Sequence, residues 1–131
     1  MRRPEWPRFF RPQVSPVTFD ACFITILPKF DNDGIPLTDE ARAVLDAIVL
    51  RFGAYSTESV QGEWVGPDGT RYGDDSARVT VFCAAADRAD ARALVADAGR
   101  TLRQEAMFFE WRHPVDAEVI DTPNPHPEPD P

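Results

Sequence analysis

The chain has 131 residues, of which 43% are hydrophobic, which is enough for one domain with a buried core and too little for two domains of ordinary size. Its 22 acidic and 14 basic side chains give a formal charge of −8, so the long-range field repels nucleic-acid phosphates and acidic membrane surfaces. Composition therefore predicts neither nucleic acid nor a membrane as the partner.

The two ends of the chain have the composition of arms outside one central domain. Residues 1–16 interleave four arginines with prolines and with the aromatic residues Trp6, Phe9 and Phe10. We interpret them as a solvated or surface-docked arm, with a nucleic-acid-binding arm as the alternative. Residues 121–131 alternate proline with polar residues, which favours an extended tail. The folded domain is predicted to span residues 17–120.

No secretory signal is expected, because the apolar run at 19–27 contains Asp20 and is not followed by a small-residue cleavage site. The run is also too short to cross a bilayer. Cys22 and Cys83 do not have the spacing of zinc ligands, and no glycine-rich phosphate-binding loop is present in the sequence. The sequence thus predicts a cytoplasmic protein with reduced thiols, no metal and no cofactor.

The first half of the domain is predicted to hold a strand and a helix. Residues 19–27 (FDACFITIL) are rich in aromatic and β-branched side chains and end before Pro28, as a buried strand does. Further on, Thr38 offers an N-cap, apolar residues recur at steps of three and four, and Gly53 supplies a left-handed C-cap. We therefore predict a helix from Thr38 to Gly53.

The second half is predicted to hold a hairpin, a helix and a strand. Residues 60–65 and 70–84 have the composition of strands, and the turn GPDG at 66–69 joins them. Residues 87–105 form a second amphipathic helix. Residues 107–112 (MFFEWR) form the last strand.

The resulting order is strand, helix, strand, strand, helix, strand. Right-handed crossovers acting on this order give a four-stranded antiparallel sheet with both helices on one face, the ferredoxin-like α+β arrangement. Alternation predicts that the side chains facing the helices are Cys22, Ile24, Ile26, Val79, Val81 and Cys83. The two cysteines should then lie close together as buried thiols, with a redox pair as the alternative.

The opposite alternation places a set of aromatic and hydroxyl side chains on the face that no helix covers: Phe23, Thr25, Trp64, Thr80, Phe82, Phe109 and Trp111. A soluble monomer seldom leaves such a patch exposed. A second copy, the terminal arms or stacked RNA bases would each cover it, and the net charge disfavours RNA. We expect self-association, so a homodimer or another protein is the predicted partner.

Carboxylates are the side chains with catalytic potential. Asp74 and Asp75 are adjacent, so on an extended strand they face opposite sides and do not act as a pair. Glu105 follows Gln104 where the second helix meets the last strand, and a carboxylate is unfavourable at that helix end. We expect it to accept hydrogen bonds from backbone amides or from Ser76 in a structural role, with a catalytic role as the alternative.

The segments FGAYSTESVQGEWVGPDGTRYGDDSARVTVF and RQEAMFFEW together resemble a family of small bacterial proteins known only as a domain of unknown function. The residues that carry the resemblance are Gly62, Trp64, Asp68, Gly69, Asp75, Ser76, Gln104 and Glu105. The family has no established activity. The resemblance implies that Trp64, Asp75, Ser76 and Glu105 form one cluster, which is either a hydrogen-bond network that holds the fold or the floor of a small site.

These observations favour a non-catalytic binding or assembly module that acts through the open face of the sheet. The alternative is a small enzyme, either a cofactor-free oxygenase or isomerase of the dimeric α+β barrel type or a metal-dependent hydrolase that uses Asp75 and Glu105. An enzyme needs a concave pocket with a shifted carboxylate, whereas a module needs only an apolar surface.

Overall fold

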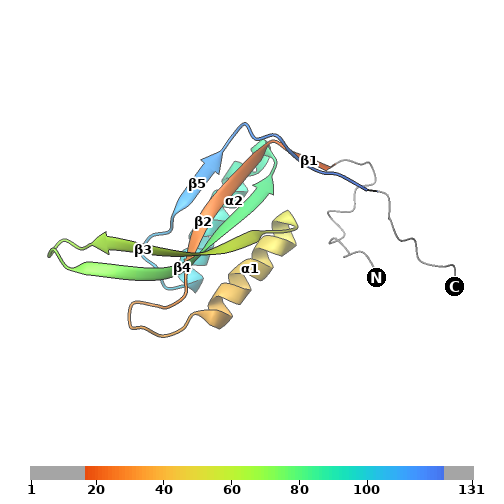
Figure 1. Cartoon of the computed structure of the whole chain (residues 1–131). Coiled ribbons are helices and arrows are strands. Elements are labelled where there is room, and N and C mark those ends of the chain that lie inside the picture. The colour runs from red at the N-terminus through yellow and green to blue at the C-terminus, as the bar shows by residue number, and fades with distance from the viewer. Residues whose placement is uncertain (1–16, 123–131) are drawn as a thin grey trace.

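The computed structural model describes residues 17–122 (Figure 1). Its elements are β1 (Val17–Phe19), β2 (Ala21–Pro28), α1 (Thr38–Phe52), β3 (Ser56–Val65), β4 (Arg71–Cys83), a 3-10 turn (Ala85–Asp87), α2 (Arg88–Thr101), β5 (Phe109–Arg112) and β6 (Ala117–Val119). Residues 1–16 and 123–131, which hold the predicted arm and most of the predicted tail, lie outside the described residues.

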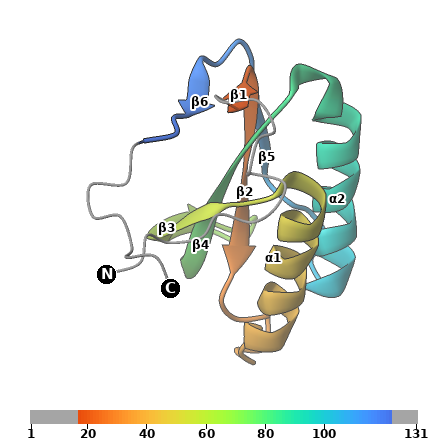
Figure 2. The same cartoon turned by 90° about the vertical axis from the view of Figure 1, so that its right-hand side faces the viewer.

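The strands of the described residues form two antiparallel sheets. The larger sheet has the order β3-β4-β2-β5, and β1 pairs with β6 in a smaller sheet. In Figure 2 both helices lie on the same side of the larger sheet. The predicted α+β class and antiparallel pairing are confirmed. The prediction of a single four-stranded sheet missed the smaller sheet.

Asp20 divides the single strand predicted at 19–27 into β1 and β2. Its carboxylate accepts a hydrogen bond from the Ala85 amide (2.7 Å), and its carbonyl oxygen accepts one from the Val115 amide (2.8 Å). Because both bonds hold the chain in a bend at Asp20, β1 leaves the main sheet and pairs with β6 instead.

Helix α1 has nearly the predicted limits. Val44 and Ile48 are buried on its core side, and Gly53 follows with φ 101° and donates its amide to the Val49 carbonyl (3.0 Å). The prediction of Thr38 as the N-cap is wrong, because the cap position is Leu37, which makes no side-chain cap bond. The fully buried Leu37 side chain anchors the start of the helix in the core.

The second helix is shorter than predicted. α2 ends at Thr101, Arg103 adopts a left-handed φ of 55°, and the Gln104 amide donates to the Gly99 carbonyl (2.8 Å). Glu105 therefore lies in the loop before β5 and not at the end of the helix. Neither helix of residues 17–122 is long and apolar enough to cross a membrane.

β2 lies between β4 and β5 and is buried on both of its faces. Phe23 is opposite Val81 on β4, and Thr25 is opposite Val79, so these side chains share one side of the sheet. Phe23, Val79 and Val81 belong to the core that packs under the helices. The alternation predicted for β2 is therefore wrong by one residue, because Phe23 and Thr25 face the helices.

The face predicted for the side chains of β5 is also wrong. Trp111 is opposite Phe23 and Phe109 is opposite Thr25, and both aromatic side chains pack against the core under the helices. The rings of Phe23 and Phe109 lie 5.8 Å apart. The side chains on the helix-free side of β2 are Cys22, Ile24 and Ile26. On β4 the predicted orientation is confirmed, with Val79, Val81 and Cys83 toward the helices and Thr80 and Phe82 away from them.

The two thiols lie on opposite faces of the sheet, so the expected close contact on one face is wrong. Cys83 is opposite Ala21 in the helix-facing core, whereas Cys22 is opposite Phe82. Each cysteine is only 4% exposed. Burial raises the pKa of the Cys83 thiol to about 12 and also raises the pKa of Cys22.

We expect neither thiol of the native protein to be alkylated by iodoacetamide at about pH 8, because the thiolate is the nucleophile and both buried thiols stay protonated. Both should react once the chain is unfolded in urea. Mass spectrometry of the quenched protein measures the modification. Rapid labelling of either cysteine without denaturant would contradict this packing.

Candidate functional site

β3 and β4 continue past the end of β2 as a two-stranded ribbon, in which residues 61–65 pair with 71–75. The last residue of β2, Pro28, is opposite Ser76, and the Lys29 amide then donates to the Asp75 carbonyl (3.1 Å). Beyond that bond the chain turns away toward α1. The ribbon projects from the body of the domain in Figure 1.

The predicted turn residues close the tip of the ribbon. The Gly66 amide donates to the Thr70 carbonyl (2.8 Å), and the Asp68 carboxylate accepts from the Thr70 amide (2.9 Å). Gly69 has φ 80°, a conformation that glycine adopts without strain. Asp68 and Gly69 therefore shape the turn, at the far end of the ribbon from Asp75 and Ser76.

A cleft of about 800 Å³ lies beside β4 at the base of the ribbon. Three parts of the chain form its walls: the ribbon, the loop after β2 and the segment between α2 and β5. The residues that line it include Phe30, Asp31, Asp74, Asp75, Ser76, Gln104 and Phe108. This cleft is the candidate site, because it is lined by Asp75 and Ser76 of the implied cluster, although Glu105 is not part of its lining.

Asp31 fixes the loop wall of the cleft. Its carboxylate accepts hydrogen bonds from the amides of Asp33 and Ile35 (both 2.9 Å) and from the Arg103 guanidinium (3.3 Å). The Ile35 amide is the main reason that the pKa of Asp31 lies below its ordinary value. Arg103 also lies 3.6 Å from Glu40, so the arginine ties this loop to the start of α1 and the end of α2.

We expect Asp31→Asn to lower the free energy of unfolding at neutral pH, because the ionised carboxylate has better partners in the folded state. A lowered pKa contributes stability above its unfolded value of 3.8, and that stability is lost as the pH falls through the folded value. The variant should therefore lose less stability than the wild type on acidification below about 4. Urea unfolding over a pH series measures both effects.

Asp33→Asn is the matched control for this prediction. Asp33 lies in the same exposed loop, and its carboxylate makes no hydrogen bond or ion pair with the described residues. The control should leave the pH dependence unchanged. Equal pH profiles for the Asp31 variant and the wild type would refute the role of Asp31.

The two adjacent carboxylates on β4 have different surroundings. Asp75 forms an ion pair with Lys29 (3.2 Å), whose ammonium also donates to the Ser59 hydroxyl (3.3 Å). Asp74 makes no hydrogen bond or ion pair with the residues of 17–122. The sequence excludes a catalytic pair of Asp74 and Asp75, because adjacent side chains of a strand face opposite sides. Asp74 is nevertheless the acidic residue of the cleft that has no cationic partner among residues 17–122.

Ser76 is the buried polar side chain of the cleft. The residue is only 5% exposed and lines the cleft wall. Its hydroxyl makes no hydrogen bond within the described part of the chain. The sequence suggested a hydrogen bond from Ser76 to Glu105. The structure does not contain this bond, and Glu105 is exposed and outside the lining of the cleft. Gln104 uses its side-chain amide to donate to the Leu102 carbonyl (3.0 Å).

The remaining predicted residues are not gathered into the cleft. Gly62 lies in the ribbon opposite Asp74, with open space where a Cβ would be. The backbone of Trp64 is opposite Tyr72, and the Trp64 side chain is outside the description. In residues 17–122 no three His, Cys, Asp or Glu side chains are grouped so that they could hold a metal ion.

The helix-free face of the sheet is not the aromatic patch that the sequence predicted. Of the predicted set, Phe82 is 39% exposed there, and its ring lies 6.2 Å from Phe19 of β1. On the same face, Arg112 of β5 is bonded to Glu110 (2.5 Å). Phe23, Phe109 and Trp111 instead pack under the helices.

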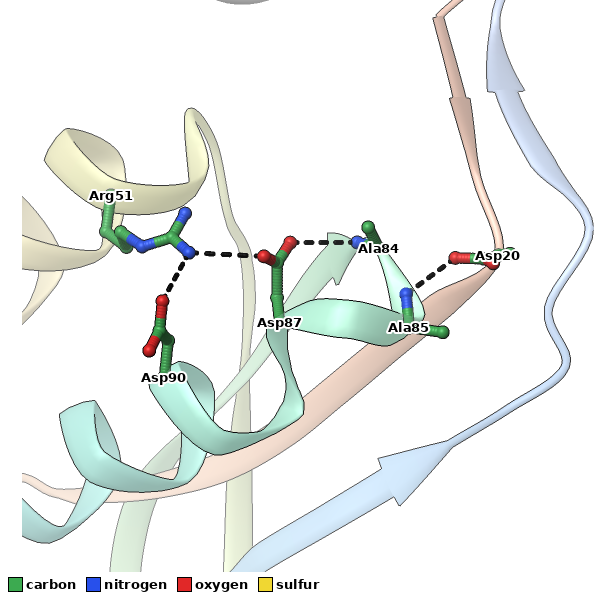
Figure 3. Close-up of polar contacts among 6 residues, drawn as sticks. All are labelled: Asp20, Arg51, Ala84, Ala85, Asp87 and Asp90. Atoms are coloured by element: carbon green, nitrogen blue, oxygen red, sulfur yellow. Dashed lines mark hydrogen bonds and ion pairs between the residues drawn. The ribbon is translucent and has the colours of Figure 1, made fainter.

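A second polar cluster lies at the opposite end of the helices (Figure 3). Arg51 at the end of α1 contacts Asp87 (3.1 Å) and Asp90 (2.6 Å), at the start of α2. Asp87 also accepts from the Ala84 amide (3.1 Å). Because Arg51 contacts both carboxylates, this cluster joins the two helices.

No protein-family model matches the chain, and no curated protein matches it significantly. The resemblance to the family of unknown function therefore has no independent support. The fold does have relatives among solved structures.

A phage SAM lyase in complex with S-methyl-5′-thioadenosine is similar to the chain with a TM-score of 0.59 at 14% identity, over 78% of this chain and 90% of the lyase. CutA from Synechococcus elongatus gives a TM-score of 0.53 at 10% identity, over 79% of this chain and 85% of CutA. A Bacillus cereus protein related to NIF3 gives 0.55 at 12% identity, over 78% of this chain and 27% of that protein. At these identities the likeness shows a shared α+β fold.

Proposed function

We propose that the chain is a non-catalytic assembly module that self-associates through the outer edge of β3. The observation that carries this proposal is the length of the edge. β3 has ten residues, and no strand of residues 17–122 pairs with its outer side. Such an edge presents a row of backbone amides and carbonyls that another strand can bond.

The features that usually prevent an edge strand from pairing with another chain are absent or neutralised in β3. Its sequence, STESVQGEWV, contains neither proline nor lysine. Its two carboxylates form ion pairs with arginines of the neighbouring strand β4, Glu58 with Arg78 (3.7 Å) and Glu63 with Arg71 (3.1 Å). The charge that would otherwise repel an approaching strand is therefore partly cancelled.

A second copy of the same chain is the partner that this edge fits. A two-fold axis presents one edge to itself, and two β3 strands then pair antiparallel and continue the ferredoxin-like sheet. Gly62 leaves open space in the ribbon for a close backbone approach. Each copy carries a formal charge of −8, so salt should strengthen the association by screening repulsion.

The enzyme alternative has one structural observation in its favour, the cleft at the base of the ribbon. The hydrolase version loses its proposed pair, because Asp75 is bound to Lys29 and Glu105 lies outside the cleft lining. The assembly proposal uses no cofactor and no catalytic group.

We expect Gln61→Lys to weaken self-association about tenfold, because two lysines near the two-fold axis repel each other. Gln61 is exposed on the edge, so the monomer should keep its fold. Light scattering after size-exclusion chromatography of the full chain, over a concentration series in low and high salt, measures the dimer Kd.

Leu50→Lys on α1 is the matched control, since Leu50 is 84% exposed on a helix and the change adds the same charge. The control should dimerise like the wild type. Equal weakening by both variants, or a wild type that stays monomeric at high concentration and high salt, would exclude the β3 edge as the assembly surface.

A further inference from the structure

We propose that the cleft at the base of the ribbon binds a small organic cation that carries an aromatic ring. This inference is separate from the proposed assembly, because the cleft lies beside β4 whereas the assembly edge is the outer side of β3. A volume of about 800 Å³ is within the range of small-molecule sites.

The charge of the lining selects a cation. The described residues of the lining include three acidic ones, Asp31, Asp74 and Asp75, and no lysine, arginine or histidine. Asp31 is already held by two amides and Arg103, and Asp75 is held by Lys29. Asp74 is the carboxylate left to bind a ligand cation, and the two paired ones disfavour an anion.

Ser76 independently indicates a ligand. The residue is 95% buried, and its hydroxyl makes no hydrogen bond with a described residue. Because no buried side-chain oxygen of the described residues lacks a partner, this hydroxyl is open to the cleft that Ser76 lines, where a ligand can reach it. Ser76 and Asp74 are two positions apart on β4, so their side chains point to the same side of the strand about 7 Å apart. One polar group of a ligand bonds to the carboxylate while another reaches the hydroxyl.

Apolar walls complete the site. Phe30 from the loop after β2 is 48% exposed, and Phe108 from the segment before β5 is 50% exposed. Exposed phenyl rings stack on a flat ring and also attract a cation placed over their faces. The cleft therefore offers an anionic side at Asp74 and an aromatic side at Phe30 and Phe108.

A bare metal ion fits this lining less well. Calcium and magnesium take six or more oxygen ligands, several of them carboxylates. No group of three metal-binding side chains is assembled in the described residues. An organic cation needs only one free carboxylate and uses the apolar walls that a metal ion would leave exposed.

The test uses tryptamine as the probe and tryptophol as its neutral counterpart, titrated into the full ¹⁵N-labelled chain and followed by NMR. We expect tryptamine to shift the amide signals of Asp74, Ser76 and Phe108 in a saturable way, and tryptophol to bind at least about tenfold more weakly, because it lacks the charge that Asp74 binds.

Asp74→Asn should weaken tryptamine binding by about tenfold, because it removes the charge and keeps the shape. Asp116→Asn is the control, since Asp116 is an exposed carboxylate between β5 and β6 and the change in net charge is the same. Ser76→Ala should also weaken tryptamine binding, by a smaller factor than Asp74→Asn.

Equal binding of the two probes, an effect of Asp116→Asn as large as that of Asp74→Asn, or the absence of saturable shifts up to millimolar probe would overturn the proposal. The Gln61→Lys variant separates it from the assembly proposal. Tryptamine binding that persists in a monomeric Gln61→Lys chain supports the cleft alone, and dimerisation without any probe binding supports the edge alone.

Discussion

The pairing of β2 on both of its sides is the constraint on which the rest of the structure depends. β2 bonds to β4 along eight residues and to β5 along four, and its side chains are buried toward the helices and toward the opposite face. β2 ends at Pro28, which is opposite Ser76 of β4. The residues of β4 from Arg71 to Asp75 lie beyond this point and pair only with β3, as the ribbon. The ribbon and the cleft both follow from the different lengths of these two strands.

The sequence predicted the elements better than their faces. The periodicity of Val44 and Ile48 with Gly53 defines α1, and the turn chemistry of Asp68 and Gly69 defines the hairpin, because these signals are local. β2 carries no comparable signal, since both alternating sets of side chains in the run ACFITIL are apolar apart from Thr25. A shift of one residue exchanges the two faces of a strand, which is why Phe23 and Thr25 were placed on the wrong side.

The site shows the same limit. Asp75 and Ser76 were expected to belong to one cluster and do line one cleft, which Gln104 also lines. Glu105 was expected with them, but Arg103 turns the chain with a left-handed φ, held by ion pairs to Asp31 and Glu40, and Glu105 falls outside. The aromatic walls come from two loops that are distant in sequence. Their meeting depends on tertiary packing, which no local pattern encodes.

The ribbon is the structural element that the assembly edge and the cleft share. A two-stranded ribbon alone is marginally stable in water, because its outer backbone groups and half of its side chains stay solvated. Pairing of β3 with a second copy would act in the plane of the sheet, whereas Asp74 and Ser76 project out of that plane from β4. The two uses therefore do not compete for the same groups. The proposed association at β3 would order the ribbon whose second strand, β4, carries Asp74, and so would lower the conformational entropy that is lost when a ligand binds the cleft.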